Sequence, residues 1–333
     1  MADLLSTVRA QPTAVATLRR ALALGRVHHA YLFDGPDGVG KERTAFGLAQ
    51  ALVCQRRSDG ASDACGECSA CTRSVPRSGQ TRPLHPDVVV LERGLYDPAT
   101  LGRRSPETQE ISIDQVRTLV LARAAFAPHE GRAKVFLVRR AEELSISAAN
   151  ALLKTLEEPG ARTHFVLLSS TADALLPTIR SRTQRVRFGA LPDAVVAELL
   201  AARGTEGALA VEIAGLAGGS MTTAMALGDP EASAQRERFV SLALEALKTR
   251  DLGRALELAE EAKKGDRATL RVHIQALAAA LAAQGRSFAA APDRRAEVAA
   301  ARYALTLAAA EQLDGNASAQ LAVEAMLMRM RSA

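Results

Sequence analysis

Seven residues of this chain, Gly35 to Lys41, have the types and spacing of a phosphate-binding loop. The segment reads GPDGVGK. Gly35, Gly38 and Gly40 permit a tight backbone whose N–H groups can surround an anion, and Lys41 can reach the phosphates. In the full pattern a Ser or Thr follows the lysine and holds Mg²⁺, but here that position is Glu42. A carboxylate there adds negative charge beside the phosphates, so ATP and Mg²⁺ are expected to bind weakly or not at all.

Hydrolysis of a nucleotide also needs acidic residues at the end of a later strand, where they hold the metal and orient water. The candidate strand, Lys134–Val138, is followed by Arg139 and Arg140. Glu142 and Glu143 come later, past the usual position at the strand tip. Two separate departures thus predict little or no ATP hydrolysis by this chain.

The four cysteines of the chain fall in one window, with the spacing C-x10-C-x2-C-x2-C. They are Cys54, Cys65, Cys68 and Cys71. Four thiolates make a closed tetrahedral site, which favours a structural Zn²⁺. An iron–sulfur cluster is the rival interpretation, and a disulfide is disfavoured in a reducing compartment.

The elements that must position these residues are strands alternating with helices. Short apolar runs predict strands, and the residues between several of them have helical periodicity. The helix with Ile146 and Leu156 on one face is expected to end before Pro159. The runs lie at Tyr31–Phe33, Val88–Leu91, Val135–Val138, Phe165–Leu168 and Arg185–Phe188. This order predicts an α/β fold, a parallel sheet with helices on both faces.

The phosphate loop falls at the turn between the strand Ala30–Phe33 and the helix Glu42–Val53. A chance glycine turn is the alternative, and the strand and helix on either side of the loop disfavour it. The segment Glu92–Gln109, with its prolines and glycine, is expected to be an irregular loop.

After Phe188 the pattern becomes Ala- and Leu-rich and helical. We expect three parts: an α/β core to about residue 188 with the cysteine module at 54–71, a small helical lid at 189–228, and a helical collar at 229–333. The Ala/Leu faces of the collar, such as Leu321 to Leu327, predict packing between subunits.

Composition narrows the class of protein further. The net charge of +5 and pI near 9.3 are only mildly basic, and aromatic residues make up 3% with no Trp, which argues against a stacking platform for single-stranded nucleic acid. No apolar run reaches about 18 residues, and the N-terminus lacks the apolar core of a signal peptide. A cytoplasmic protein without a membrane partner is expected.

A resemblance to a known family becomes specific at Ala148–Pro159, AANALLKTLEEP. This segment resembles the clamp-loader branch of the AAA+ family, and within that branch the delta-prime subunits of bacterial DNA polymerase III. The resemblance extends over about two-thirds of the chain and fades in the last third, except for Asn316 through Leu327. Its other motifs are His29–Phe33, the four-cysteine insertion, His85-Pro86-Asp87, Ile113–Arg117 and Ile179–Arg182.

The resemblance implies a role in DNA replication. Clamp loaders are hetero-pentameric rings of gamma/tau, delta and delta-prime subunits that use ATP to place the sliding clamp on primed DNA. Delta-prime members carry the zinc module, generally do not hydrolyse ATP, and act as a stator that completes the ring. DNA-directed DNA polymerase activity, a nucleotidyltransferase reaction, belongs to the holoenzyme and not to this chain.

The same resemblance gives Arg182 a role. The family's Ser-Arg-Cys motif appears here as Ser181-Arg182-Thr183, so Arg182 takes the place of the arginine finger offered in trans to a neighbouring subunit's ATP. The alternative is a solvated arginine in the basic cluster of Arg180, Arg182, Arg185 and Arg187.

Two other functions are alternatives to a non-hydrolysing clamp-loader subunit. An ATP-hydrolysing gamma/tau-type motor requires different residues at Glu42, at Arg139 and at Thr222, where the lid arginine that senses nucleotide is missing. A zinc-dependent DNA-binding regulator requires a basic helix beside the cysteines, but Arg73, Arg77 and Arg82 lie among Pro and Gly. The hydroxyls of Ser169–Thr171 stand where the family contacts a phosphate, but an ordinary polar strand end is the preferred explanation.

Overall fold

The computed structural model of the chain describes residues 3–102, 110–248, 253–264, 267–288, 293–314 and 317–332. Contacts divide the chain into two compact units, Met1–Val195 and Val196–Ala333. The predicted boundaries near 188 and 228 are not tested by this division and stay predictions. The part of the predicted 92–109 loop from 103 to 109 lies outside the described residues, as does Asn316; Pro98–Leu101 forms a 3-10 turn.

The first unit is built on a parallel five-stranded sheet of order β2-β3-β4-β1-β5. The five predicted strands are all present, which confirms the α/β fold class. Their bounds are β1 Ala30–Asp34, β2 Val88–Leu91, β3 Lys134–Val138, β4 Thr163–Ser169 and β5 Gln184–Arg187. In register, Tyr31 of β1 lies between Val166 of β4 and Gln184 of β5. All residues of β2 and β3 are buried, as expected for strands covered on both faces.

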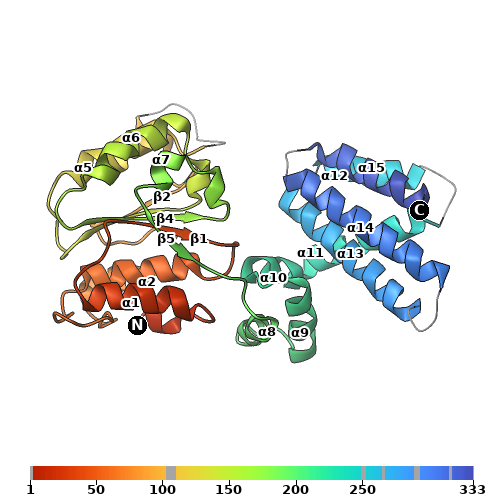
Figure 1. Cartoon of the computed structure of the whole chain (residues 1–333), viewed down its shortest axis with the longest axis horizontal. Coiled ribbons are helices and arrows are strands. Elements are labelled where there is room, and N and C mark those ends of the chain that lie inside the picture. Colours follow the sequence, from red (N-terminus) through yellow and green to blue (C-terminus); the bar gives the residue numbers. More distant parts are fainter. Residues whose placement is uncertain are drawn as a thin grey trace. The chain divides into compact units, whose positions relative to one another are not determined.

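Helices cover both faces of this sheet. In Figure 1, α1 (Pro12–Ala23) and α2 (Lys41–Val53) lie on one face, and α5 (Ala122–Ala124), α6 (Ile146–Glu157) and α7 (Pro177–Arg180) on the other. The short α3 (Ser69–Arg73) follows the third cysteine, and α4 (Ile113–Val116) leads through a π-helical turn, Arg117–Leu121, into α5. Ser145 caps α6 by accepting a hydrogen bond from Ala148 N at 3.1 Å, and the helix ends before Pro159 as predicted.

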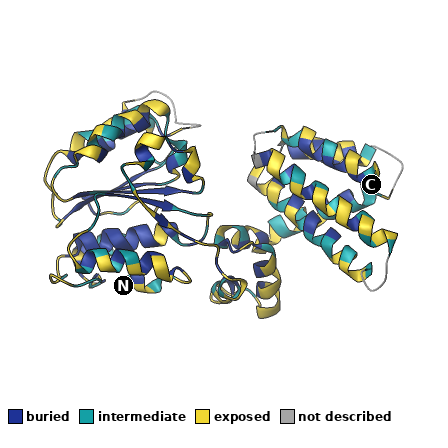
Figure 2. Ribbon diagram, in the orientation of Figure 1, coloured by how far each residue is buried: buried dark blue, intermediate teal, exposed yellow. Residues whose placement is uncertain are grey.

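The core of the first unit lies between the sheet and these helices, where Figure 2 shows α2 and the strands other than the edge strand β5 as buried. Phe136 of β3 and Phe165 of β4 stack with ring centroids 5.1 Å apart. Leu152 and Leu156 of α6 pack into the same cluster. Burial of these apolar side chains fixes the strand ends, where the polar residues of the candidate site lie.

The second unit is helical. Its helices are α8 Asp193–Ala201, which begins at the end of the first unit, α9 Gly207–Leu216, α10 Met221–Gly228, α11 Pro230–Ala246, α12 Gly253–Lys264, α13 Arg267–Phe288, α14 Arg294–Asp314 and α15 Ala319–Ser332. The last five share one core, which includes Leu258, Leu277, Val323 and Leu327. The prediction that the face from Leu321 to Leu327 packs between subunits is therefore wrong for Val323 and Leu327, which pack within this unit, while Leu321 is exposed.

Candidate functional site

The phosphate loop lies where β1 turns into α2, as the sequence predicted. Gly35, Gly38 and Gly40 have φ values of 154°, 75° and 101°, so all three lie in conformations that favour glycine. A Cβ added to Gly35 would lie 2.2 Å from the carbonyl oxygen of Phe188. Only glycine therefore fits at the start of the loop.

Lys41 is turned back onto its own loop. Its ammonium donates hydrogen bonds to the carbonyl oxygens of Gly35 and Pro36, the latter at 2.7 Å, and lies 3.4 Å from Asp37 Oδ1. The residue is only 7% exposed, and burial lowers the pKa of Lys41 from its ordinary value. The donors that would reach a phosphate are thus engaged by the loop itself.

The two departures from a hydrolysing site form one ion pair. Arg139, directly after β3, binds Glu42 Oε1 at 2.5 Å and Glu92 Oε2 at 2.7 Å. The guanidinium is largely buried and lies 5.8 Å from the ring centre of Phe46. Burial opposes its charge, but the carboxylates of Glu42 and Glu92 outweigh burial and raise the pKa of Arg139.

The remaining acids near the loop are also engaged. Glu143 binds Arg140 at 3.2 Å. Glu142 accepts hydrogen bonds from the hydroxyl of Ser170 at 2.8 Å and from its backbone N–H at 3.3 Å. A nucleotide with Mg²⁺ would need Lys41 released and a neutral oxygen ligand where Glu42 stands, so these residues do not fit that group.

The four cysteines come together as predicted. Their sulfur atoms all lie within 4.8 Å of one another, and all four are free thiols. Cys65 Sγ and Cys71 Sγ are 3.8 Å apart, and a tetrahedral site with zinc–sulfur bonds of about 2.3 Å requires roughly this sulfur separation. Four sulfurs in this arrangement fit a metal ion.

Backbone N–H groups point at the sulfurs. Cys65 N donates to Cys54 Sγ at 3.4 Å, Cys68 N to Cys65 Sγ at 3.3 Å, and Cys71 N to Cys68 Sγ at 3.5 Å. Burial raises the pKa of the Cys68 thiol, but N–H donors, chiefly from Cys71 and Gln55, outweigh it and lower the pKa to about 6. Thiolate is the form that binds metal, and the N–H donors favour it at Cys68, whereas burial raises the pKa of the Cys71 thiol.

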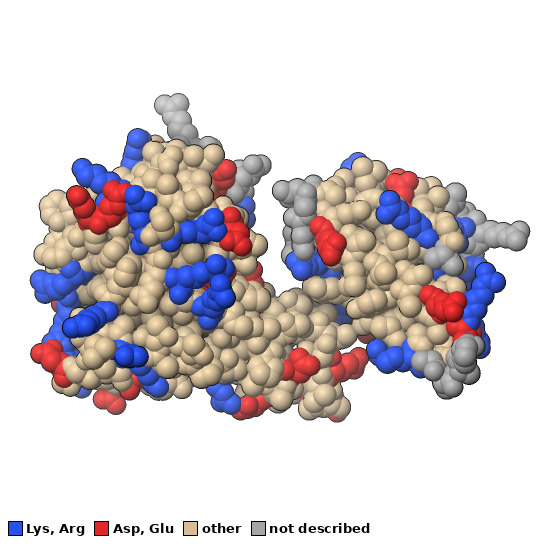
Figure 3. All heavy atoms as spheres, viewed as in Figure 1, with Lys and Arg blue, Asp and Glu red and all other residues tan. Residues whose placement is uncertain are grey.

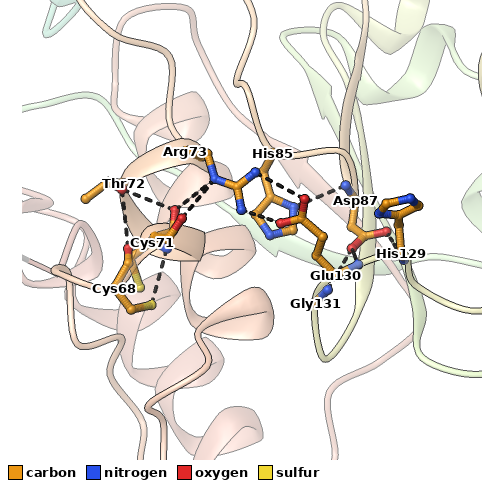
Figure 4. Close-up of polar contacts among 10 residues, drawn as sticks. Cys68, Cys71, Thr72, Arg73, His85, Asp87, His129, Glu130 and Gly131 are labelled. Carbon is orange, nitrogen blue, oxygen red and sulfur yellow. Dashed lines mark hydrogen bonds and ion pairs between the residues drawn. The ribbon is translucent and has the colours of Figure 1, made fainter.

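A polar network joins the cysteine module to the sheet. In Figure 4, Arg73 of α3 faces Glu130, with which it forms an ion pair, and the carboxylate of Asp87 is turned toward residues 129–131. Asp87 is fully buried and accepts three backbone hydrogen bonds, at 2.6 Å from His129 and at 2.8 Å from Glu130 and from Gly131. The sequence identified His85-Pro86-Asp87 only as a motif of the resemblance and did not predict that Asp87 anchors a loop. The sequence signal for this role is an acid that directly follows a proline and directly precedes an apolar strand.

Arg182 follows α7 and lies in a surface pocket. Its Nε donates to Glu157 Oε1 at 2.6 Å, and its Nη1 donates to the carbonyl oxygen of Thr178 at 3.0 Å. Glu157 is a partner that the sequence did not indicate. Of the other arginines in the cluster, Arg180 binds Asp173 at 2.6 Å and Arg185 binds Asp34 at 2.5 Å.

The predicted site residues thus form three separate groups within the first unit: the phosphate loop, the cysteines and Arg182. Thr222, where the resemblance leads us to expect an arginine in a motor subunit, lies in the second unit. There Ser220 caps α10 by accepting a hydrogen bond from Thr223 N at 3.2 Å, and Met221 and Thr222 form its first turn. On the face shown in Figure 3, Lys and Arg side chains form several small groups with Asp and Glu between some of them. None of the described helices is long and apolar enough to cross a membrane.

A parallel sheet of this strand order, with a phosphate loop after a central strand, defines an AAA+-type P-loop protein. Comparison with known proteins narrows this class. Residues 10–192, more than half of the chain, match the model of the family described as DNA polymerase III, delta subunit. The chain belongs to this family.

The similar proteins include two kinds of DNA polymerase III subunit, delta' and gamma/tau. The chain is 40% identical over 217 residues to DNA polymerase III subunit delta' of Pseudomonas aeruginosa, covering 64% of this chain and 59% of that protein. It is 37% identical over 191 residues to subunit gamma/tau of Mycobacterium bovis, covering 57% and 29% of the two chains. The match thus spans less than two thirds of either relative. The resemblance to delta-prime subunits that the sequence indicated is confirmed.

Among solved structures, a DNA polymerase III gamma-subunit-related protein of Thermotoga maritima aligns with a TM-score of 0.43 at 17% identity, over 95% of this chain and 98% of that one.

Proposed function

We propose that this chain is the delta-prime subunit of a DNA polymerase III clamp loader, a stator that does not hydrolyse ATP. The observation that carries this proposal is the self-occupied phosphate loop, in which Lys41 binds the loop carbonyls and Glu42 binds Arg139. A motor subunit needs the lysine free for phosphate, a Ser or Thr at position 42 for the metal, and an acid in place of Arg139. The similarity to gamma/tau subunits makes a motor the second candidate, and the same contacts argue against it.

In this proposal the chain completes a hetero-pentameric ring with gamma/tau and delta subunits, and the ring loads the sliding clamp on primed DNA. Arg182 is the arginine finger in trans, because its planar fork of donors suits charge developing on a neighbour's γ-phosphate. The helices from 229 onward are the collar that holds the ring together, and 189–228 is the lid. The protein works in the cytoplasm.

The test is clamp- and DNA-stimulated ATP hydrolysis by the complex reconstituted with the organism's own partner subunits. Arg182→Ala is expected to slow turnover at the adjoining site by on the order of 10³-fold. Arg187→Ala removes an exposed arginine of the same cluster and serves as the matched control, expected to be silent. Equal rates for the two variants would contradict the role of Arg182.

We also propose that the metal of the cysteine module is Zn²⁺ in a structural role. Four sulfurs within 4.8 Å and their N–H donors support it. Elemental analysis of the purified chain is expected to find one zinc per chain and no iron, and chelation is expected to unfold the module. A metal-free protein that is fully folded would contradict this assignment.

A further inference from the structure

The pocket that holds Arg182 is a shallow cavity of about 440 Å³ on the first unit. Within the described chain its lining contains a single carboxylate, that of Glu157. The other lining residues are His28, His29, Leu156, Ser181, Arg182, Thr183 and Gln184. His28 and His29 stack with ring centroids 4.2 Å apart, and burial lowers the pKa of His29. A phosphate entering this pocket meets the guanidinium of Arg182, which is already paired with the carboxylate of Glu157.

All three nitrogens of the Arg182 guanidinium are engaged. Nε and Nη2 bind Glu157 Oε1, and Nη1 binds the carbonyl oxygen of Thr178 at 3.0 Å and Ser181 Oγ at 3.3 Å. The side chains are 32% exposed for Arg182 and 47% exposed for Glu157, so an approaching anion can reach the pair. A phosphate that binds the Nε and Nη2 edge of Arg182 takes those donors away from Glu157.

The position of Glu157 in its helix supports a role outside the helix. It is the last residue of α6, where the helix dipole disfavours a carboxylate. Its neighbour Glu158 is exposed at the same helix end, and no side-chain partner of Glu158 is found among the described residues. Glu157 differs from Glu158 in facing the arginine, and this contact offsets the unfavourable position.

We propose that Glu157 is a latch, a positioning residue that holds Arg182 in the pocket until the phosphate of a neighbouring subunit's nucleotide replaces it. Its carboxylate occupies the place of that phosphate, since both are anions that bind a guanidinium through the same donors. The proposal rests on the proposed function, in which Arg182 acts in trans.

The experiment measures kcat and KM for ATP with the reconstituted complex, the clamp and primed DNA. The variants of this chain are Glu157→Gln, Arg182→Ala and the two together, with Glu158→Gln as the matched control. Glu157→Gln is expected to lower KM by about two- to fivefold, the range of one exposed ion pair, with kcat unchanged. In the Arg182→Ala background the same substitution is expected to change nothing, because the group it releases is gone.

The outcomes separate the latch from the proposed function. If Arg182→Ala slows hydrolysis while Glu157→Gln matches Glu158→Gln, the latch is overturned and the proposed function stands. A fall in kcat with Glu157→Gln also overturns the latch, because Glu157 would then assist the arginine. If Arg182→Ala is silent, the arginine-finger role of Arg182 fails, and the latch with it, while the ring-completing role is left standing. Glutamine keeps the size of Glu157 and suits a helix equally well, so the variant is expected to fold.

Discussion

At the scale of single residues, the charges around the phosphate loop are paired with one another. Lys41 binds the carbonyls of Gly35 and Pro36, and Arg139 is held between Glu42 and Glu92. Each contact satisfies a group that would otherwise be a buried, unpaired charge, which is costly. The loop therefore has the backbone of a nucleotide site, and its charges are balanced without a nucleotide.

This arrangement predicts that the chain does not respond to ATP. Lys41→Ala is expected to leave ATP hydrolysis by the reconstituted complex unchanged, whereas the equivalent change in a motor subunit removes a phosphate contact. Thermal unfolding of the isolated chain is expected to show the same Tm with and without Mg²⁺ and ATP, because a ligand that does not bind cannot stabilise. A rise in Tm with ATP that disappears in Lys41→Ala would show that the lysine still binds phosphate.

At the scale of elements, Asp87 joins the turn before β2 to the turn before β3. Its carboxylate accepts hydrogen bonds from the backbone N–H groups of His129, Glu130 and Gly131. The side chain of Glu130 in turn forms an ion pair with Arg73, which lies beside the cysteines. The cysteine module is thus connected to the sheet through residues 129–131. A substitution at Arg73 or at Asp87 is therefore expected to reduce the stability of both the cysteine module and this loop.

The anchor predicts an acid-dependent stability. Burial raises the pKa of Asp87, but its three N–H donors outweigh burial and hold the pKa below the ordinary value of 3.8. A carboxyl whose pKa is lowered by folding stabilises the protein above its unfolded pKa, and this stabilisation is lost as the pH falls through the folded value.

Asp87→Asn is therefore expected to lower the free energy of unfolding at pH 7 by about 2 kcal/mol, since the charge-assisted hydrogen bonds weaken. The difference from the unsubstituted protein is expected to shrink as the pH falls below 3.8. Urea denaturation over this pH range measures it, with Asp59→Asn, at a fully exposed side chain, as the control. A difference independent of pH would contradict the role of the charge.

The elements were largely predictable from the sequence, and the contacts between distant residues were not. Local composition and spacing identified the five strands, the phosphate loop and the cysteine cluster, because each of these features depends on residues that are close together in the sequence. Glu42 and Arg139 lie far apart in the sequence, as do Glu157 and Arg182, and only the strand order brings them together. The sequence therefore indicated two separate departures from a hydrolysing site, at Glu42 and at Arg139, whereas in the structure these two residues form one ion pair.

At the scale of the whole molecule, the chain has two compact units, each with its own apolar core. The cluster around Phe136 and Phe165 belongs to the first, and that around Leu277 and Val323 to the second. Neither core includes residues of the other unit. Each has the buried apolar surface that a domain requires.

The predicted division near residue 228 can be tested by truncation. A fragment of residues 1–228 is expected to retain the α/β fold and the proposed metal but to fail to enter the proposed ring, because it lacks the helices proposed as the collar. Circular dichroism and metal content report the fold, and size-exclusion chromatography with the partner subunits reports assembly. A fragment that assembles normally would place the oligomerising surface in the first 228 residues.

The Glu42–Arg139 ion pair also bears on how the site could change in evolution. Glu42→Thr alone leaves Arg139, largely buried, with only Glu92 for its charge. Arg139→Asp alone places a third carboxylate beside Glu42 and Glu92, where like charges repel. Each first step toward a metal-binding site therefore passes through a less stable intermediate, so the lineage that carries this pair is expected to keep it.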